Sequence, residues 1–216
     1  MTIDERDRVL AHFKKKYDLR VWAYFAWMFF TGMRPEEAIA LRWSDVDFGR
    51  QEVLVQRVRT FRGCERDGSK TDDQRTVDLV PEALEALTAM KQYTFMKRTE
   101  REGDDDTACD IFENSVTQRT WHDERSQRDH YWAPTLRALG IRRRRAYATR
   151  HTYCTTALMG RVNPAYIAAQ AGHSVKMLLE VYARGIPGND NGAERAVMAA
   201  AMARRSGPTS SPGGSG

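Results

Sequence analysis

The spacing of apolar and polar residues predicts that the chain begins with helices. Apolar residues recur at helical spacing through the first twenty residues, which predicts an amphipathic helix. Residues 21–30 are apolar on every side and predict a central, fully buried helix. The pattern breaks at Gly32 and resumes as a helix over residues 36–42.

A short stretch of strands follows. Residues 52–58 and 76–80 alternate apolar and polar side chains, and Gly63 and Gly68 lie between them. We therefore expect a small antiparallel sheet with a hairpin. Residues 110–112 predict a short edge strand.

The rest of the chain is predicted to be helical. We expect helices at residues 81–90, 125–139, 149–159, from 163 onward, 174–182 and 191–204. The fold class is thus α+β, mainly α-helical with a small antiparallel β-sheet. We expect one domain over residues 1–190, a C-terminal helix at 191–204 and a flexible tail at 205–216.

Composition fits a globular cytoplasmic protein. Hydrophobic residues make up 41% of the chain, and its longest apolar run, 21–30, is too short to span a bilayer. The polar N-terminus does not resemble a signal peptide. Cys64, Cys109 and Cys154 are far apart in sequence and form no CxxC pair, so we expect neither structural zinc nor disulfides.

Positive charge is concentrated in one region. The net charge is +5, and residues 119–150 contain nine Arg, no Lys and three acidic residues. The run Arg142, Arg143, Arg144 and Arg145 favours contacts with phosphate, because guanidinium groups bind it bidentately. The alternative interpretation is a solvated basic loop.

Five polar residues lie where the fold alone does not require them: Arg34, Lys70, Arg150, His173 and Tyr182. Each of them has an ordinary structural explanation when taken singly, such as an ion pair, a solvated loop side chain or a half-buried ring. Their order and spacing carry the functional hypothesis.

The segments around them resemble the motifs of tyrosine recombinases, the family of the phage integrases. TGMRPEEAIALRW resembles the first arginine motif, which here holds Arg34 and Glu37. SKTDDQRTVDLVP resembles the hairpin of the catalytic lysine, and YATRHTYCTTAL resembles the HxxRH motif. In AAQAGHSVKMLLEVYAR a Gly-His pair precedes a tyrosine, Tyr182, by nine residues. The resemblance spans residues 5–186 and implies the catalytic-domain fold of this family.

The resemblance also implies a chemistry without metal or cofactor. Arg34, Arg150 and His173 would stabilise the charge on a phosphodiester under attack, and Tyr182 would form a 3′-phosphotyrosyl link. Lys70 would protonate the departing 5′ oxygen.

One motif position departs from the family pattern. Tyr147 stands where the first histidine of HxxRH is expected, and a phenol is a poor base at neutral pH. His151 follows Arg150 and points to another side of the helix. We therefore expect His151, like Glu37, to pack or hydrogen-bond behind the groups that contact the phosphate.

These features favour a site-specific recombinase that integrates or excises a phage or another mobile element. Its expected partners are double-stranded DNA of a bacterial host, further copies of the chain in a tetramer, and accessory DNA-bending proteins. The C-terminal helix is a candidate for exchange between protomers. Family members usually carry an N-terminal DNA-clamping domain, so we expect this chain to be a fragment that binds DNA weakly alone.

Three alternatives stay open on the sequence. A type IB topoisomerase would use the same chemistry only to relax supercoils. A non-catalytic DNA-binding protein could keep the fold, although the intact set of five polar residues argues against it. An RNA-binding protein would explain the arginine run but not the spacing of Tyr182.

Overall fold

The computed structural model describes residues 1–59, 65–67, 74–95, 110–121, 125–182 and 191–203. The chain divides into two compact units, Met1–Gly185 and Ile186–Gly216. In the described part of the chain, no helix has the length and apolar character needed to cross a membrane.

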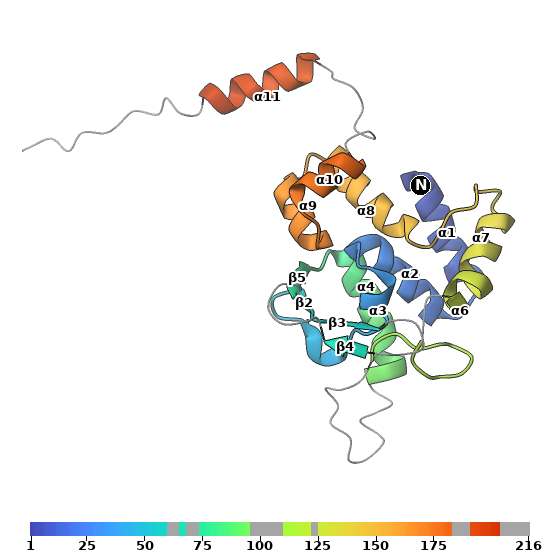
Figure 1. Cartoon of the computed structure of the whole chain (residues 1–216). Helices are drawn as coiled ribbons and strands as arrows, with labels where there is room; N and C mark the ends of the chain where they lie inside the picture. Colours follow the sequence, from blue (N-terminus) through green and yellow to red (C-terminus); the bar gives the residue numbers. More distant parts are fainter. Residues whose placement is uncertain (60–64, 68–73, 96–109, 122–124, 183–190, 204–216) are drawn as a thin grey trace, which may run out of the picture. The chain divides into compact units, whose positions relative to one another are not determined.

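The first unit is mainly helical (Figure 1). Its α-helices are α1 (Ile3–Lys16), α2 (Leu19–Thr31), α3 (Pro35–Ala38), α4 (Pro81–Met90), α6 (Arg125–Gln127), α7 (Ala133–Ala138), α8 (Ala148–Met159), α9 (Pro164–Ala171) and α10 (Val175–Tyr182). Two π-helical turns, Lys91–Phe95 and Arg128–Trp132, extend α4 and join α6 to α7.

Most of these helices lie where the sequence predicts them, and the differences occur at their ends. The first helix stops at Lys16 because the carboxylate of Asp18 accepts a hydrogen bond from the Arg20 amide and caps α2. The helix expected at 36–42 shrinks to α3, a single turn. Tight turns replace its second half, where the Leu41 amide bonds the Ala38 carbonyl.

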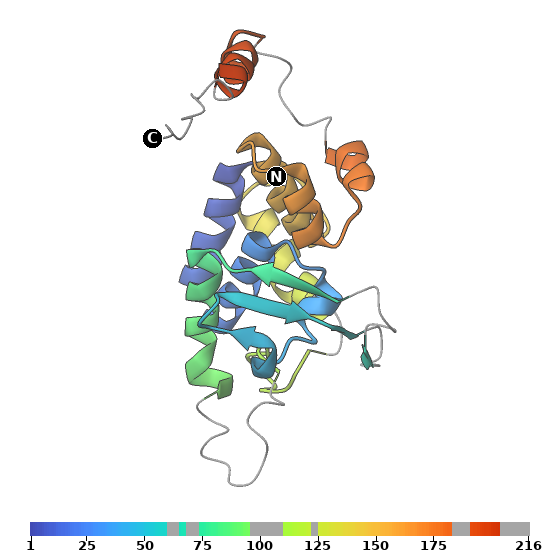
Figure 2. The ribbon, with the colours of Figure 1, turned by 90° about the vertical axis from the view of Figure 1, so that its left-hand side faces the viewer.

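The strands form two small antiparallel sheets (Figure 2). The strands are β1 (Val46–Asp47), β2 (Glu52–Val55), β3 (Arg57–Arg59), β4 (Glu65–Asp67) and β5 (Arg75–Asp78). One sheet has the order β1-β2-β5 and the other pairs β3 with β4, which confirms the antiparallel sheet.

Two strand predictions need correction. The strand expected over 52–58 breaks at Gln56, whose side-chain amide donates to Asp45 at 2.8 Å, so β2 and β3 belong to different sheets. The edge strand expected at 110–112 is wrong. Only Asp110 pairs there, in an isolated bridge with Arg42, while Ile111 and Phe112 are buried in the core.

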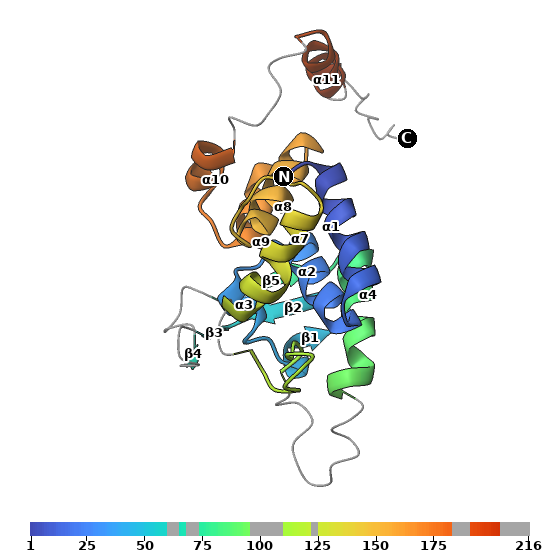
Figure 3. The ribbon, with the colours of Figure 1, turned by 90° about the vertical axis from the view of Figure 1, so that its right-hand side faces the viewer.

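Helix α2 forms the centre of the main core, as its apolar sequence predicts. It packs against α1, α4 and α8 (Figure 3). The rings of Phe13 and Phe25 stack at 4.5 Å between centroids, and Trp132 stacks on Phe25 at 5.4 Å. Stacked aromatic pairs of this kind add to the stability gained from burial.

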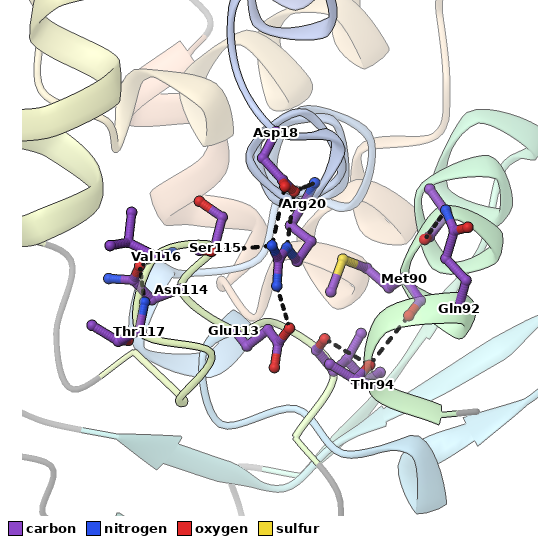
Figure 4. Close-up of polar contacts among 12 residues, drawn as sticks. Asp18, Arg20, Met90, Gln92, Thr94, Glu113, Asn114, Ser115, Val116 and Thr117 are labelled. Carbon is purple, nitrogen blue, oxygen red and sulfur yellow. Dashed lines mark hydrogen bonds and ion pairs between the residues drawn. The ribbon is translucent and has the colours of Figure 1, made fainter. Parts of the chain in front are cut away.

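A buried ion-pair cluster ties residues 110–121 to the start of α2 (Figure 4). The guanidinium of Arg20 bonds both carboxylate oxygens of Asp18, the Glu113 carboxylate at 2.7 Å and the Ser115 carbonyl at 3.0 Å. Its partners satisfy this buried charge, so the cluster is structural rather than a free binding site.

A second, smaller core joins α8, α9 and α10, and α9 also packs against β5. Helices α9 and α10 begin as predicted, with Asn163 accepting a hydrogen bond from Ala165 and Ser174 from Met177. The second unit contains α11 (Asn191–Ala203), in the segment where the sequence predicts a C-terminal helix.

Candidate active site

Arg34 lies just after a turn whose backbone conformation requires glycine at position 32. Gly32 ends α2 with φ +63°, and a Cβ there would lie 2.4 Å from Cδ1 of Tyr153. The chain then reverses into α3. The Arg34 guanidinium donates to Glu37 at 2.8 Å and to the Gly172 carbonyl at 3.0 Å.

Glu37 is a buried hub that serves two arginines. Its side chain is 3% exposed and accepts bonds from Arg34 and, at 2.9 and 2.7 Å, from both terminal nitrogens of Arg75. Burial alone would favour the neutral acid. The hydrogen bonds and charge of Arg75, with those of Arg34, nevertheless hold the pKa of Glu37 at about 2. This geometry gives Glu37 the supporting position expected from the sequence.

Arg75 is a member of this network that the sequence does not reveal. It lies on β5, and its Nε donates to the Gln170 carbonyl at 2.9 Å. A Cβ on Gly172 would lie 3.1 Å from Nη1 of Arg75, so the guanidinium packs tightly against the turn before His173. Its partners are far away in sequence, and no local pattern identifies them.

Arg150 is fully buried, and its partners among the described residues are neutral groups. It bonds the Gly32 carbonyl at 2.7 Å, the Ala171 carbonyl, and Nε2 of His173 at 2.7 Å. Burial lowers its pKa, and no carboxylate among the described residues forms an ion pair with it. A buried guanidinium that forms no ion pair with a carboxylate is suited to bind an anion.

The bond from Arg150 fixes the tautomer of His173. A guanidinium can only donate, so Nε2 of His173 must be the unprotonated nitrogen. Burial and the nearby arginines lower the pKa of His173 to about 4, so the ring is neutral at pH 7 and carries its proton on Nδ1. Nδ1 is buried and has no partner among the described residues. It can therefore donate a bond to a ligand.

Tyr182 ends α10 and faces the same region. It is 4% exposed, and its ring lies 6.1 Å from that of His173 and 5.2 Å from that of His151, between centroids. Its side chain lies in the same small core as Cys154. Burial, together with Cys154, raises the pKa of Tyr182.

Tyr147 and His151 lie beside this group. Both line a pocket of about 870 Å³ together with Arg34 and Arg145, and their rings are 5.4 Å apart. Tyr147 is close enough to interact electrostatically with the guanidinium groups of Arg34 and Arg150. His151 lies on the pocket side of the site rather than behind it, which differs from the position expected from the sequence.

The arginine run divides into members with different surroundings. Arg144 pairs with Glu5 at 3.3 Å, and its carbonyl accepts the Trp132 indole at 2.8 Å, so it helps to hold the fold. Arg142, Arg143 and Arg145 are all exposed, and Arg145 also lines the pocket. Lys70 lies outside the described residues.

The structure thus brings Arg34, Tyr147, Arg150, His173 and Tyr182 into one region. This region holds two buried or half-buried guanidiniums, a buried imidazole donor and the phenol of Tyr182. The arrangement can bind a tetrahedral anion such as a phosphodiester next to a nucleophile.

Known proteins with similar sequences are integrases and recombinases. The chain is 32% identical over 171 residues to the prophage integrase IntR of Escherichia coli strain K12, covering 72% of this chain and 41% of that protein. It is 26% identical over 188 residues to a XerC-like tyrosine recombinase of Caldanaerobacter subterraneus, covering 78% and 46%. The chain spans less than half the length of these curated relatives.

Solved structures confirm the expected fold. The Tn1549 transposon integrase in complex with transposon right end DNA matches with a TM-score of 0.71 at 16% identity, over 92% of this chain and 64% of that one. XerA recombinase matches with a TM-score of 0.62 at 21% identity, over 97% and 65%. The catalytic domain of bacteriophage HP1 integrase matches with 0.59 at 16% identity, over 90% and 92%.

The family model described as the phage integrase family matches residues 1–186, which include the whole first unit. This chain therefore belongs to the phage integrase family.

Proposed function

We propose that this chain is the catalytic domain of a site-specific tyrosine recombinase. It would cleave and rejoin DNA through a 3′-phosphotyrosyl intermediate, and so integrate or excise a phage or another mobile element. The single observation that carries the proposal is the fully buried Arg150, which has no carboxylate partner in the described parts of the chain and bonds the imidazole next to Tyr182.

The phosphodiester would bind where three donors converge. A phosphate under attack carries extra charge on its non-bridging oxygens, and paired guanidiniums neutralise that charge without metal. Arg150 and Arg34 supply the guanidiniums, and Nδ1 of His173 supplies a further donor. Tyr147 can add a hydroxyl donor in place of the family histidine.

Tyr182 would be the nucleophile. In this structure its side chain is buried beside Cys154, so it must become accessible before the oxygen can reach phosphorus. Attack would displace the 5′ oxygen, which Lys70 would protonate. The phosphotyrosine keeps the energy of the broken ester, so a DNA hydroxyl can reverse the step.

Double-stranded DNA is the proposed substrate and partner. The Tn1549 integrase, whose fold this chain shares, was solved in complex with transposon right end DNA. On this chain, Arg142, Arg143 and Arg145 are exposed cations close in sequence to Arg150 and suited to the flanking phosphates. Helix α11 exposes Val197, Met198 and Met202, which supports self-association into a tetramer by helix exchange.

The experiment that tests this function uses nicked duplexes with diverse sequence, labelled at either end of the cleaved strand. A recombinase should attach to the 3′ phosphate, release a 5′ hydroxyl and produce strands joined between two duplexes. Relaxation of supercoiled plasmid without such joined strands would identify a topoisomerase instead. Binding without cleavage by a longer chain that includes the remaining family length would contradict the proposal.

A further inference from the structure

Two imidazoles border the ring of Tyr182, and only one of them can readily accept a proton. His173 uses the lone pair of Nε2 to accept the Arg150 bond at 2.7 Å. Its Nδ1 already carries a proton. His173 can therefore donate to a phosphate oxygen, but it cannot take the phenol proton without losing Arg150.

His151 is the other imidazole, and its surroundings are different. Its side chain is exposed to the pocket, and neither ring nitrogen has a hydrogen-bond partner among the residues that the structure describes. The centroid of its ring lies 5.2 Å from that of Tyr182 and 5.4 Å from that of Tyr147. Tyr147 is the N-cap residue of α8 and lies four residues before His151, so both side chains lie on one helical face.

We propose that His151 is the proton acceptor for Tyr182 during DNA cleavage, in place of the histidine that Tyr147 replaces. The inference rests on the proposed function, in which Tyr182 is the nucleophile. The Tyr182 O–H bond breaks and its proton moves to a ring nitrogen of His151, while the phenolic oxygen bonds phosphorus. The bond from phosphorus to the 5′ oxygen breaks, and that oxygen takes a proton from Lys70. Rejoining reverses each transfer.

The charges around His151 favour this role. Partial burial, then the chain's amino group and Arg150, lower its pKa, so the ring is neutral at pH 7 and has one unprotonated nitrogen. Tyr182 has a raised pKa and therefore needs a base. Titratable and charged groups face His151 from its own helix, α10, the turn before α10, the pocket wall and the N-terminus. They are Tyr147, Arg150, Tyr182, His173, Arg34, Glu36, Arg145 and the Met1 amine.

The test is single-turnover cleavage of a nicked duplex by the full chain across pH 5 to 9. His151→Gln should slow formation of the covalent complex by about 100-fold at pH 7. The wild-type cleavage rate should rise with pH and level off once His151 is neutral. The rate of the variant should not show this rise, which is the acidic limb of the pH–rate profile. Added imidazole should restore part of the rate to His151→Ala. His130→Gln is the matched control, because His130 is an exposed histidine on the α6–α7 helical run.

The outcomes separate this inference from the proposed function. A His151→Gln protein that cleaves at the wild-type rate with an unchanged acidic limb overturns the role of His151, even while Tyr182→Phe abolishes cleavage. His151→Gln could instead cleave slowly and still lose rate as the pH falls, while imidazole fails to restore the rate of His151→Ala. That result also overturns the role of His151, because a merely structural defect would behave that way. A covalent complex that survives Tyr182→Phe overturns the proposed nucleophile and this inference together.

Discussion

At the scale of single residues, the site depends on how each buried charge is compensated. Glu37 accepts hydrogen bonds from Arg34 and Arg75, whereas Arg150, among the described residues, donates only to carbonyls and an imidazole. The first arrangement ties α3 to β5, and the second leaves the charge of Arg150 without an ion pair. Residues of the same type therefore serve different purposes within one network.

The Glu37 hub predicts an acid-dependent loss of stability. Its pKa is about 2 in the fold, below its ordinary value, so its contribution is present above about pH 4.5 and is lost as the pH falls toward 2. Glu37→Gln should lower the free energy of unfolding by about 3 kcal/mol at pH 7. Urea unfolding at several pH values measures the free energy of unfolding of both proteins. The difference between the variant and wild type should disappear in acid. Glu36→Gln, on the same helix but half-exposed, should change little. A gap that does not depend on pH would contradict the prediction.

The divided arginine run predicts two separable effects. Arg145→Ala should weaken DNA binding, reduce the slope of log affinity against log salt by about 0.9, and leave stability unchanged. Arg144→Ala should lower the melting temperature because it removes the ion pair with Glu5, and it should have a smaller effect on the salt slope. Binding titrations over a range of salt concentrations and thermal melts separate the two. Equal salt slopes for both variants would argue against the assignment.

At the scale of elements, two helix ends assemble the site. Gly32 and Gly172 end α2 and α9 in the left-handed region, with φ +63° and +64°. In each turn the glycine carbonyl accepts a hydrogen bond from a guanidinium. Gly32 accepts from Arg150, and Gly172 accepts from Arg34. The turns therefore fix the two guanidiniums while they reverse the chain.

Replacing Gly32 tests this role of the turn. In Gly32→Ala the new residue must adopt a positive φ, and its Cβ would lie 2.4 Å from Cδ1 of Tyr153. The change should therefore destabilise the fold by several kcal/mol and displace Arg34. Gly140→Ala is the matched control, because Gly140 has φ +65° but no atom within 4 Å of its would-be Cβ. The control should cost only about 1 kcal/mol of backbone strain. Similar losses in both variants, measured by chemical unfolding, would refute the steric argument.

The sequence predicts the elements better than it predicts their contacts. The apolar run of α2, the caps at Asn163 and Ser174 and the antiparallel sheet all follow from local patterns. Arg75 could not be predicted, because its bonds to Glu37 and Gln170 exist only after β5 and α9 pack together. The place of His151 was missed because its neighbour Tyr182 comes from another helix.

At the scale of the whole molecule, the chain consists of a catalytic-domain unit and a second unit that holds α11. The first unit contains all the described site residues. The second exposes apolar side chains that a monomer would leave in water. Cleavage and assembly should therefore depend on different parts of the chain.

Met198→Glu tests this separation. The side chain is 59% exposed on α11, so the change should not disturb the first unit, but it should weaken assembly of four protomers on DNA. Mass photometry of DNA complexes should show fewer tetramers, while covalent complex per bound protein stays near wild type. Val116→Glu, at an 80% exposed position in the first unit, is the control. Undiminished tetramers in the α11 variant would exclude this helix as the contact.

The most direct test of the account is covalent trapping. The protein is incubated with a nicked duplex, quenched with SDS and digested, and the DNA-linked peptide is identified by mass spectrometry. We expect a link at Tyr182 that disappears in Tyr182→Phe and persists in Tyr166→Phe, a matched change at an exposed tyrosine. A link to any other residue, or a complex that persists in Tyr182→Phe, would contradict the central claim that Tyr182 is the nucleophile.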